Sequence, residues 1–196
     1  MKRYNPEIHH RRSIRLKGYD YSQAGAYFIT ICTENRRCLF GMVEGSEMIL
    51  NRAGEYVKEC WLKIPEHFPH AKLDEFSIMP NHIHGIIIIN ENVGVHVGVQ
   101  DFEPLHNKKC KYNPLRKINK YQQIIPKSIG SIVRGFKIGV TKWFRQNTDV
   151  YNVWQRNYYE HIIRNENELN KIREYIINNP IKWAEDKNNP VNIRNK

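Results

Sequence analysis

The chain has 196 residues, of which 40% are hydrophobic, enough for one domain with a buried core. It carries 31 Lys and Arg against 20 Asp and Glu, and the formal net charge of +11 favours a polyanion as partner: nucleic acid first, an anionic membrane surface as the alternative. The longest apolar runs are far shorter than the roughly 20 residues of a membrane-spanning helix, and the basic N-terminus lacks the apolar segment of a signal peptide. We therefore expect a soluble, cytoplasmic protein with no membrane partner.

The N-terminal part of the chain predicts an arm, two strands and a helix. Residues 1–20 are basic and lack apolar periodicity, which is typical of an arm. Residues 26–33 are rich in aromatic and β-branched side chains and predict a central strand, with a short partner at residues 38–43 that forms a hairpin with it. From residue 51 to about 68, apolar side chains recur at helical spacing, which predicts an amphipathic helix.

Two further strands are predicted on either side of a turn at Pro80 and Asn81, at residues 72–80 and 82–90. The second strand is apolar on both faces after its first residues, which indicates that both faces are covered. The segment from 91 to about 125 has no steady period, and we expect a long loop there.

The C-terminal part predicts two helices with a strand between them. Residues 126–147 place apolar side chains on one helical face and basic side chains on the other. A short strand is expected at 150–155, and the last helix begins near Asn165 and must stop before Pro180. Residues 184–196 are expected to form a polar tail. Strands and helices mixed in this order indicate an α+β domain over residues 21–183.

The stretch MPNHIHGIIIIN contains two histidines, His82 and His84, at the start of a predicted strand. Side chains two apart in a strand project to the same face, about 7 Å apart at Cβ, so both imidazoles can reach one ion. Two histidines do not complete a metal site, and a structural role with ordinary hydrogen bonds is the alternative.

The last predicted helix places Tyr175 and Asn179 four residues apart, and therefore next to each other on one face. A phenol beside an amide can present a nucleophile and a metal ligand together. Packing at the edge of the core is the alternative role for the tyrosine, and an Asn before a proline is an ordinary helix terminator.

Three ordered segments link these two motifs. RRSIRLKGYDYSQAGAYFITICTENRRCLFG, DEFSIMPNHIHGIII and VWQRNYYEHIIRNENELNKIREYIINNPIKW together resemble the single-tyrosine HUH transposases, especially the REP-associated tyrosine transposases. The resemblance covers most of residues 11–183, apart from the loop at about 91–125. It implies a ferredoxin-like antiparallel sheet with helices on one face, the fold of HUH endonucleases.

The resemblance also implies site residues and chemistry. His82 and His84 would bind a divalent cation, Mg²⁺ or Mn²⁺, with Asn179 as third ligand. Tyr175 would attack a DNA phosphate, giving a 5′-phosphotyrosine and a free 3′-hydroxyl. Tyr158 and Tyr159 compete for the role of nucleophile, although the helical partner Asn179 favours Tyr175.

The expected partner, by the same resemblance, is single-stranded DNA that carries a hairpin, bound by a monomer or a homodimer. Phosphate contacts are expected from basic side chains of the arm, the helix at 126–147 and the segment before the last helix. The candidates are Arg11, Arg12, Arg15, Arg134, Lys137, Lys142, Arg145 and Arg164.

Two other functions remain open at this point. A transposase descendant could bind hairpin DNA without cutting it, and a metal-dependent phosphoesterase could release its product by attack of water. The presence of His82, His84, Tyr175 and Asn179 together favours the strand-transfer enzyme over a pure binding protein, and a covalent protein–DNA adduct would separate all three functions.

Overall fold

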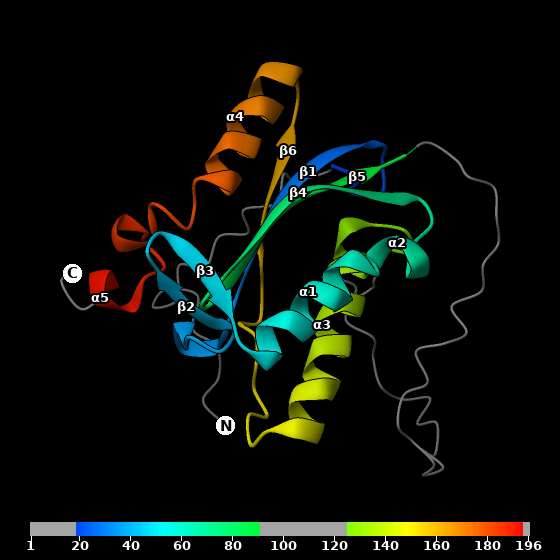
Figure 1. The fold of residues 1–196 in the computed structure, drawn as a ribbon. Helices are drawn as coiled ribbons and strands as arrows, with labels where there is room; N and C mark the ends of the chain where they lie inside the picture. Colours follow the sequence, from blue (N-terminus) through cyan, green and yellow to red (C-terminus); the bar gives the residue numbers. More distant parts are fainter. Residues whose placement is uncertain (1–18, 91–124, 194–196) are drawn as a thin grey trace, which may run out of the picture.

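The computed structural model describes residues 19–90 and 125–193 (Figure 1). The basic arm with Arg11, Arg12 and Arg15, and nearly all of the segment at 91–125, lie outside the described residues. In chain order the elements are β1 Gly25–Cys32, η1 Glu34–Arg36, β2 Gly41–Glu44, β3 Glu47–Leu50, α1 Arg52–Leu62, α2 Ile64–His67, β4 Ala71–Met79, β5 His82–Ile89, α3 Ile129–Asn147, β6 Tyr159–Ile163, α4 Glu166–Ile177, η3 Trp183–Glu185 and α5 Pro190–Ile193.

The central sheet has four antiparallel strands in the order β4-β5-β1-β6. β1 and β5 run side by side over their full lengths, from Gly25 opposite Ile89 to Cys32 opposite His82. Aromatic and β-branched side chains favour these central positions because both strands are covered on both faces. The predicted α+β class with an antiparallel sheet is confirmed.

One face of the sheet carries the main apolar core, under α1 and α3 (Figure 1). Asn51 caps α1 by accepting a hydrogen bond from the Gly54 backbone nitrogen, and Ser128 caps α3 in the same way through Ser131. Trp61 of α1 is fully buried over Gly85 of β5, where a Cβ atom would lie 2.3 Å from the indole. Glycine at that position of the strand therefore makes room for the largest core side chain.

The other face of the sheet is covered by α4, which lies apart from α1 and α3 (Figure 1). Ile176 of α4 packs on Phe28, Ile86 and Ile163 in a second, smaller apolar cluster. The prediction of helices on one face thus holds for α1 and α3, but α4 lies on the opposite face. Its apolar stripe needs a surface to cover, and β1, β5 and β6 offer apolar side chains on both sides.

The predicted hairpin between residues 26–33 and 38–43 is wrong. β2 pairs with β3, in a separate two-stranded sheet, and not with β1. The two residues of the turn, Gly45 and Ser46, both have positive φ angles, of 56° and 68°. This backbone geometry closes a tight two-residue hairpin and gives β2 a neighbour next to it in the chain.

The strand predicted at residues 150–155 is also misplaced. That segment makes only an isolated bridge between Thr33 and Trp154, and the strand that completes the sheet is β6, a few residues later. β6 pairs with β1 from Ala26 opposite Ile163 to Thr30 opposite Tyr159. Pairing with β1, and not the local apolar pattern, decides which part of this segment is extended.

The polar stretch after Trp183 folds onto the rest of the molecule, in contrast to the tail expected there. Asn188 and Asn189 are buried, and the Asn188 carbonyl accepts a hydrogen bond of 2.8 Å from the Asn81 amide nitrogen. The Arg36 guanidinium donates to the Lys187 carbonyl at 2.8 Å. These hydrogen bonds hold the segment beside the first residues of β5, although it has few apolar side chains.

Within the described ranges, no helix is long and apolar enough to span a bilayer.

Candidate active site

His82 and His84 lie at the start of β5, with both side chains on the α4 face of the sheet. They are 0% and 2% exposed, and their Nε2 atoms are 3.0 Å apart. The strand alternation that was expected to bring both imidazoles together is therefore observed. At this point the α4 face is polar, whereas further along β5 it becomes apolar with Ile86 and Ile88.

The hydrogen bonds around the two histidines determine which ring nitrogen of His82 carries the proton. The Asn81 amide nitrogen donates to the carbonyls of Arg36 and Asn188, so its Oδ1 faces His82 Nδ1 at 2.8 Å as an acceptor. His82 therefore carries its proton on Nδ1, and its Nε2 lone pair points to His84. Thr30 Oγ1 lies 2.8 Å from His84 Nδ1, and this hydrogen bond fixes the orientation of the second ring.

Burial keeps both imidazoles neutral. Desolvation, with the positive charges of Arg36 and Lys187, lowers the pKa of His82 to about 3. Desolvation and the neighbouring His82 lower the pKa of His84 well below its usual value. Neutral imidazole is the form that binds metal, so the pair is ready as a ligand at physiological pH.

Tyr175 of α4 points its hydroxyl at the histidines. Its oxygen lies 3.3 Å from His84 Nε2, and its ring meets the His84 ring edge to face with centroids 5.2 Å apart. Burial raises the pKa of the phenol, while a hydrogen bond from Asn179 opposes that rise. The phenol is therefore a weak nucleophile unless a cation lies next to it.

Asn179, in the turn that follows the end of α4 at Ile177, is 3% exposed. Its amide oxygen is buried and has no hydrogen-bond partner among the described residues. An amide oxygen in this position next to Tyr175 suits a cation ligand, because a buried acceptor without a partner is costly.

Asp186, in the segment after α4, was missed by the sequence analysis. It is the third member of a cluster with His82 and His84 in which one ligand atom from each residue lies within 4.8 Å of the others. Nothing in the polar run around Asp186 marks it, because its role depends on how that run folds back. Two imidazoles, an amide oxygen and a carboxylate form a donor set that fits a divalent cation such as Mn²⁺ or Mg²⁺.

A cleft of about 470 Å³ opens beside Tyr175 and His84. Phe28, Tyr158 and Tyr159 line it with aromatic surface. Three basic side chains that were not proposed from the sequence also line it: Arg36, Arg156 and Lys187. A cleft with aromatic rings and cations suits a single-stranded nucleic acid, which offers bases to stack and phosphates to neutralise. All three tyrosines considered as nucleophiles line this cleft, and it is the Tyr175 hydroxyl that makes the 3.3 Å contact with His84.

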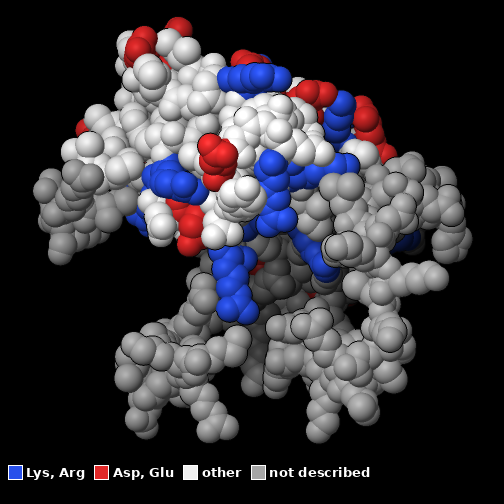
Figure 2. All heavy atoms as spheres, turned by 90° about the horizontal axis from the view of Figure 1, so that it is seen from below, with Lys and Arg blue, Asp and Glu red and all other residues white. Residues whose placement is uncertain are grey.

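The basic residues proposed from the helix at 126–147 are not part of the cleft. Arg134, Lys142 and Arg145 are exposed on α3, which packs on the opposite face of the sheet. Arg164 is exposed just before α4. Among the described residues on the face seen from below, Figure 2 shows Lys and Arg side chains interspersed with Asp and Glu.

Lys137 has a structural environment instead. Its Nζ donates to the carbonyls of Gln155 and Asn157, at 2.8 and 3.0 Å. Both residues belong to the wall of the cleft. Burial lowers the pKa of Lys137 to about 8. The ammonium group thus fixes the wall of the site and is not presented to a phosphate on the surface.

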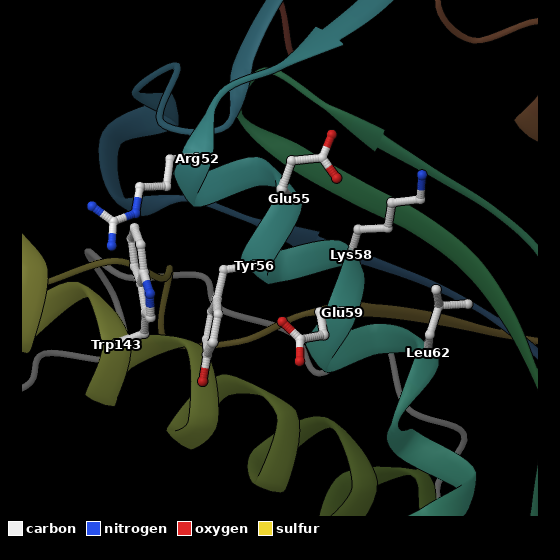
Figure 3. A pocket seen from close by; sticks show the side chains of 7 residues that line it. All are labelled: Arg52, Glu55, Tyr56, Lys58, Glu59, Leu62 and Trp143. Carbon is white, nitrogen blue, oxygen red and sulfur yellow. The ribbon is translucent and has the colours of Figure 1, made fainter.

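A second hollow, of about 480 Å³, lies between α1 and α3 (Figure 3). The rings of Tyr56 and Trp143 stack there with centroids 5.2 Å apart. Its charges balance, with Arg52 and Lys58 against Glu55 and Glu59, and none of the sequence-predicted site residues lines it. The cleft beside Tyr175 is therefore the candidate site.

Comparison with known proteins connects this chain to a family. A Haemophilus influenzae protein described as uncharacterized is 52% identical over 185 residues, which cover 94% of this chain and 96% of that protein. A second H. influenzae protein, named "Putative REP-associated tyrosine transposase", is 24% identical over 166 residues, 83% of this chain and 74% of that protein. No family model matches the chain.

Among solved structures, a REP-associated tyrosine transposase bound to a REP hairpin has the same fold. It aligns with a TM-score of 0.56 and 19% sequence identity, covering 89% of this chain and 77% of that one. The chain therefore belongs to one family with the first H. influenzae protein and is a relative of the REP-associated tyrosine transposases, whose fold it has.

Proposed function

We propose that the protein is a metal-dependent enzyme that cleaves and rejoins single-stranded DNA beside a hairpin, through a covalent link between Tyr175 and a 5′-phosphate. The observation that carries this proposal is the 3.3 Å contact between the Tyr175 hydroxyl and His84, inside a cleft lined with cations. The solved relative bound to a REP hairpin supports hairpin DNA as the partner.

Each residue of the site has a proposed role. His82 and His84 would hold the divalent cation with Asn179, the third ligand that the family resemblance implies. That cation would offset charge on the scissile phosphate and favour ionisation of the phenol. Arg36, Arg156 and Lys187 hold the phosphates on either side of the scissile bond.

Tyr175 then acts as the nucleophile. Its oxygen attacks phosphorus, the bond from phosphorus to the 3′-oxygen breaks, and the phenol proton leaves as the 3′-oxygen gains one. The products are a 5′-phosphotyrosine and a free 3′-hydroxyl. A second 3′-hydroxyl can reverse the reaction and join new DNA, because the phosphotyrosine keeps the ester bond.

One chain supplies all of the proposed site residues. The Tyr175 hydroxyl lies 3.3 Å from His84 of its own chain, which supports use of the tyrosine in cis. Mixing a Tyr175→Phe protein with a His84→Ala protein should therefore not restore activity. Recovery in the mixture would show that a second chain supplies the tyrosine.

The test is formation of a denaturant-resistant band with labelled single-stranded hairpin DNA, taken from the sequence that flanks the gene, with and without Mn²⁺. The band should form with Mn²⁺ and be absent from Tyr175→Phe and His84→Ala. Tyr159→Phe is the matched control, because Tyr159 lines the same cleft, and it should still form the band.

The alternative functions predict other outcomes. If the unchanged protein binds the hairpin tightly but forms no band on DNA that contains the cleavage site, it is a binding protein derived from a transposase. DNA cleavage without a covalent band would indicate attack by water.

A further inference from the structure

We propose that Asp186, supplied by the folded C-terminal segment, is a direct ligand of the metal site. This inference rests on the proposed function, since it names a ligand for the same cation. It makes the segment after α4 a part of the active site, whereas the sequence suggests a polar tail.

The ligand atoms have the separations of a shared ion. Asp186 Oδ2 lies 3.7 Å from His82 Nε2, and the two Nε2 atoms are 3.0 Å apart. Ligands about 2.0–2.2 Å from one cation are separated by about 3 Å when adjacent and by about 4 Å when opposite. All three atoms lie within 4.8 Å of one another, so a single ion can contact them after small side-chain adjustments.

The Asp186 carboxylate is buried without a basic side chain as ion-pair partner among the described residues. Its side chain is 6% exposed, and in the part of the chain that the structure describes no Lys or Arg forms an ion pair with it. Across the site it faces His82 Nε2, which carries a lone pair because Nδ1 donates to Asn81. A buried carboxylate and an imidazole lone pair that face each other are costly without a positive ion between them.

The surrounding backbone holds the carboxylate in this position. The Asn188 backbone nitrogen donates to Asp186 Oδ1 at 2.5 Å, which leaves Oδ2 for the site. Asn192 donates to the Asp186 carbonyl at 3.0 Å, and Asn81 ties the Asn188 carbonyl to the turn before β5. The same Asn81 side chain orients His82, so one residue positions two of the three ligands.

The carboxylate changes the affinity of the site. His82, His84 and Asn179 are all neutral ligands, and a hard divalent cation gains most from a negatively charged oxygen. Loss of the charge at Asp186 should therefore weaken binding of Mn²⁺ by about tenfold or more. A loss of that size is typical even when the removed residue only hydrogen-bonds to a metal ligand.

The test is a titration of the full chain with Mn²⁺ alone. The concentration of free Mn²⁺ is measured at each step by electron paramagnetic resonance. Asp186→Asn keeps the shape of the side chain and an oxygen acceptor for Asn188. Its affinity for Mn²⁺ should be about tenfold lower, or weaker still. Asp149→Asn, which removes the same charge at an exposed position, is the control and should bind as the unchanged protein does. If Asp186→Asn does not fold, Asp186→Ser keeps a small acceptor and should show the same loss.

Equal affinity in Asp186→Asn and the unchanged protein would overturn the inference, because Asp186 would then only cap the turn. Absence of Mn²⁺ binding by the unchanged protein would overturn it as well. The covalent-adduct test separates the two proposals: an adduct that needs Mn²⁺, with unaltered affinity in Asp186→Asn, leaves the proposed function standing without this ligand.

Discussion

The two faces of the central sheet differ in the side chains that they bury. On the α1 and α3 face, β5 presents Ile83, Gly85 and Ile87 to a continuous apolar core. On the α4 face the same strand presents His82 and His84 before it becomes apolar at Ile86. One strand therefore supplies both the stability of the fold and the polar cluster of the site.

The comparison shows that burial stabilises the fold on one face and costs stability on the other. Burial of apolar side chains favours folding, whereas burial of His82, His84 and Asn179 is costly unless each finds a partner. The orphaned amide oxygen of Asn179 and the 3.0 Å approach of the two imidazoles are the places where partners are incomplete. Changes on the first face should cost stability, and changes on the second should cost function.

The largest effect on stability is expected from Trp61→Ala. Trp61 is fully buried over Gly85, and its removal opens a cavity in the main core. The free energy of unfolding should fall by about 3–5 kcal/mol, measured by urea denaturation. A loss below about 1 kcal/mol would contradict the view that this face carries the stability of the fold.

A smaller loss is expected from Lys137→Met, which leaves the carbonyls of Gln155 and Asn157 without their donor. It should cost about 1–3 kcal/mol. The pKa of about 8 is depressed from an unfolded value of about 10.4, so the folded protein releases this proton first. Stability from this group therefore rises between about pH 8 and pH 10.4.

The measurement is urea denaturation of both proteins from pH 7 to 10.5. The unchanged protein should gain stability relative to Lys137→Met across this window. A constant difference between the two would show that the group titrates normally.

A still smaller loss is expected from Asp74→Asn. Arg173 of α4 holds Asp74 of β4 through two hydrogen bonds, of 2.8 and 2.6 Å, and thereby lowers the pKa of the Asp74 carboxyl. A depressed acid stabilises the fold above its unfolded pKa of about 3.9, and that contribution is lost as the pH falls through the folded value.

The melting temperatures of Asp74→Asn and the unchanged protein should therefore differ at pH 7 and converge in acid. A difference that persists below pH 3 would assign the effect to packing and not to the ion pair.

The smallest effect on stability is expected from Tyr175→Phe. Tyr175 is 41% exposed, and its hydroxyl has hydrogen-bond contacts with His84 and Asn179 only at the edge of the polar cluster. The free energy of unfolding should change by less than about 0.5 kcal/mol. A large loss by urea denaturation would mean that the variant is too disturbed to test the nucleophile.

The sequence predicted much of this arrangement because local patterns carry it. Aromatic and β-branched runs located β1 and β5, and apolar spacing located α1, α3 and α4, with Leu169, Ile172 and Ile176 inward. Alternation in a strand placed His82 and His84 on one face. Helical spacing placed Tyr175 and Asn179 together, and the Tyr175 contact with His84 joins the two pairs.

The rest depends on contacts between distant segments. β2 pairs with β3 because Gly45 and Ser46 adopt positive φ angles, which the apolar pattern does not show. Lys137 lies on the predicted basic face, yet the 155–157 segment covers it. Asp186 stands in a polar run that is held in place by hydrogen bonds, among them those from Asn81 and Arg36. Polar segments that fold through hydrogen bonds leave no hydrophobic period to read.

The most direct test of the proposed role of Tyr175 is to identify the residue that becomes linked to DNA. The protein would be incubated with the hairpin DNA and Mn²⁺, digested with protease and nuclease, and analysed by mass spectrometry. We expect a nucleotide remnant on the peptide that contains Tyr175, and only when Mn²⁺ is present. A remnant on Tyr158 or Tyr159, or equal yield without metal, would contradict the account of a metal-assisted Tyr175.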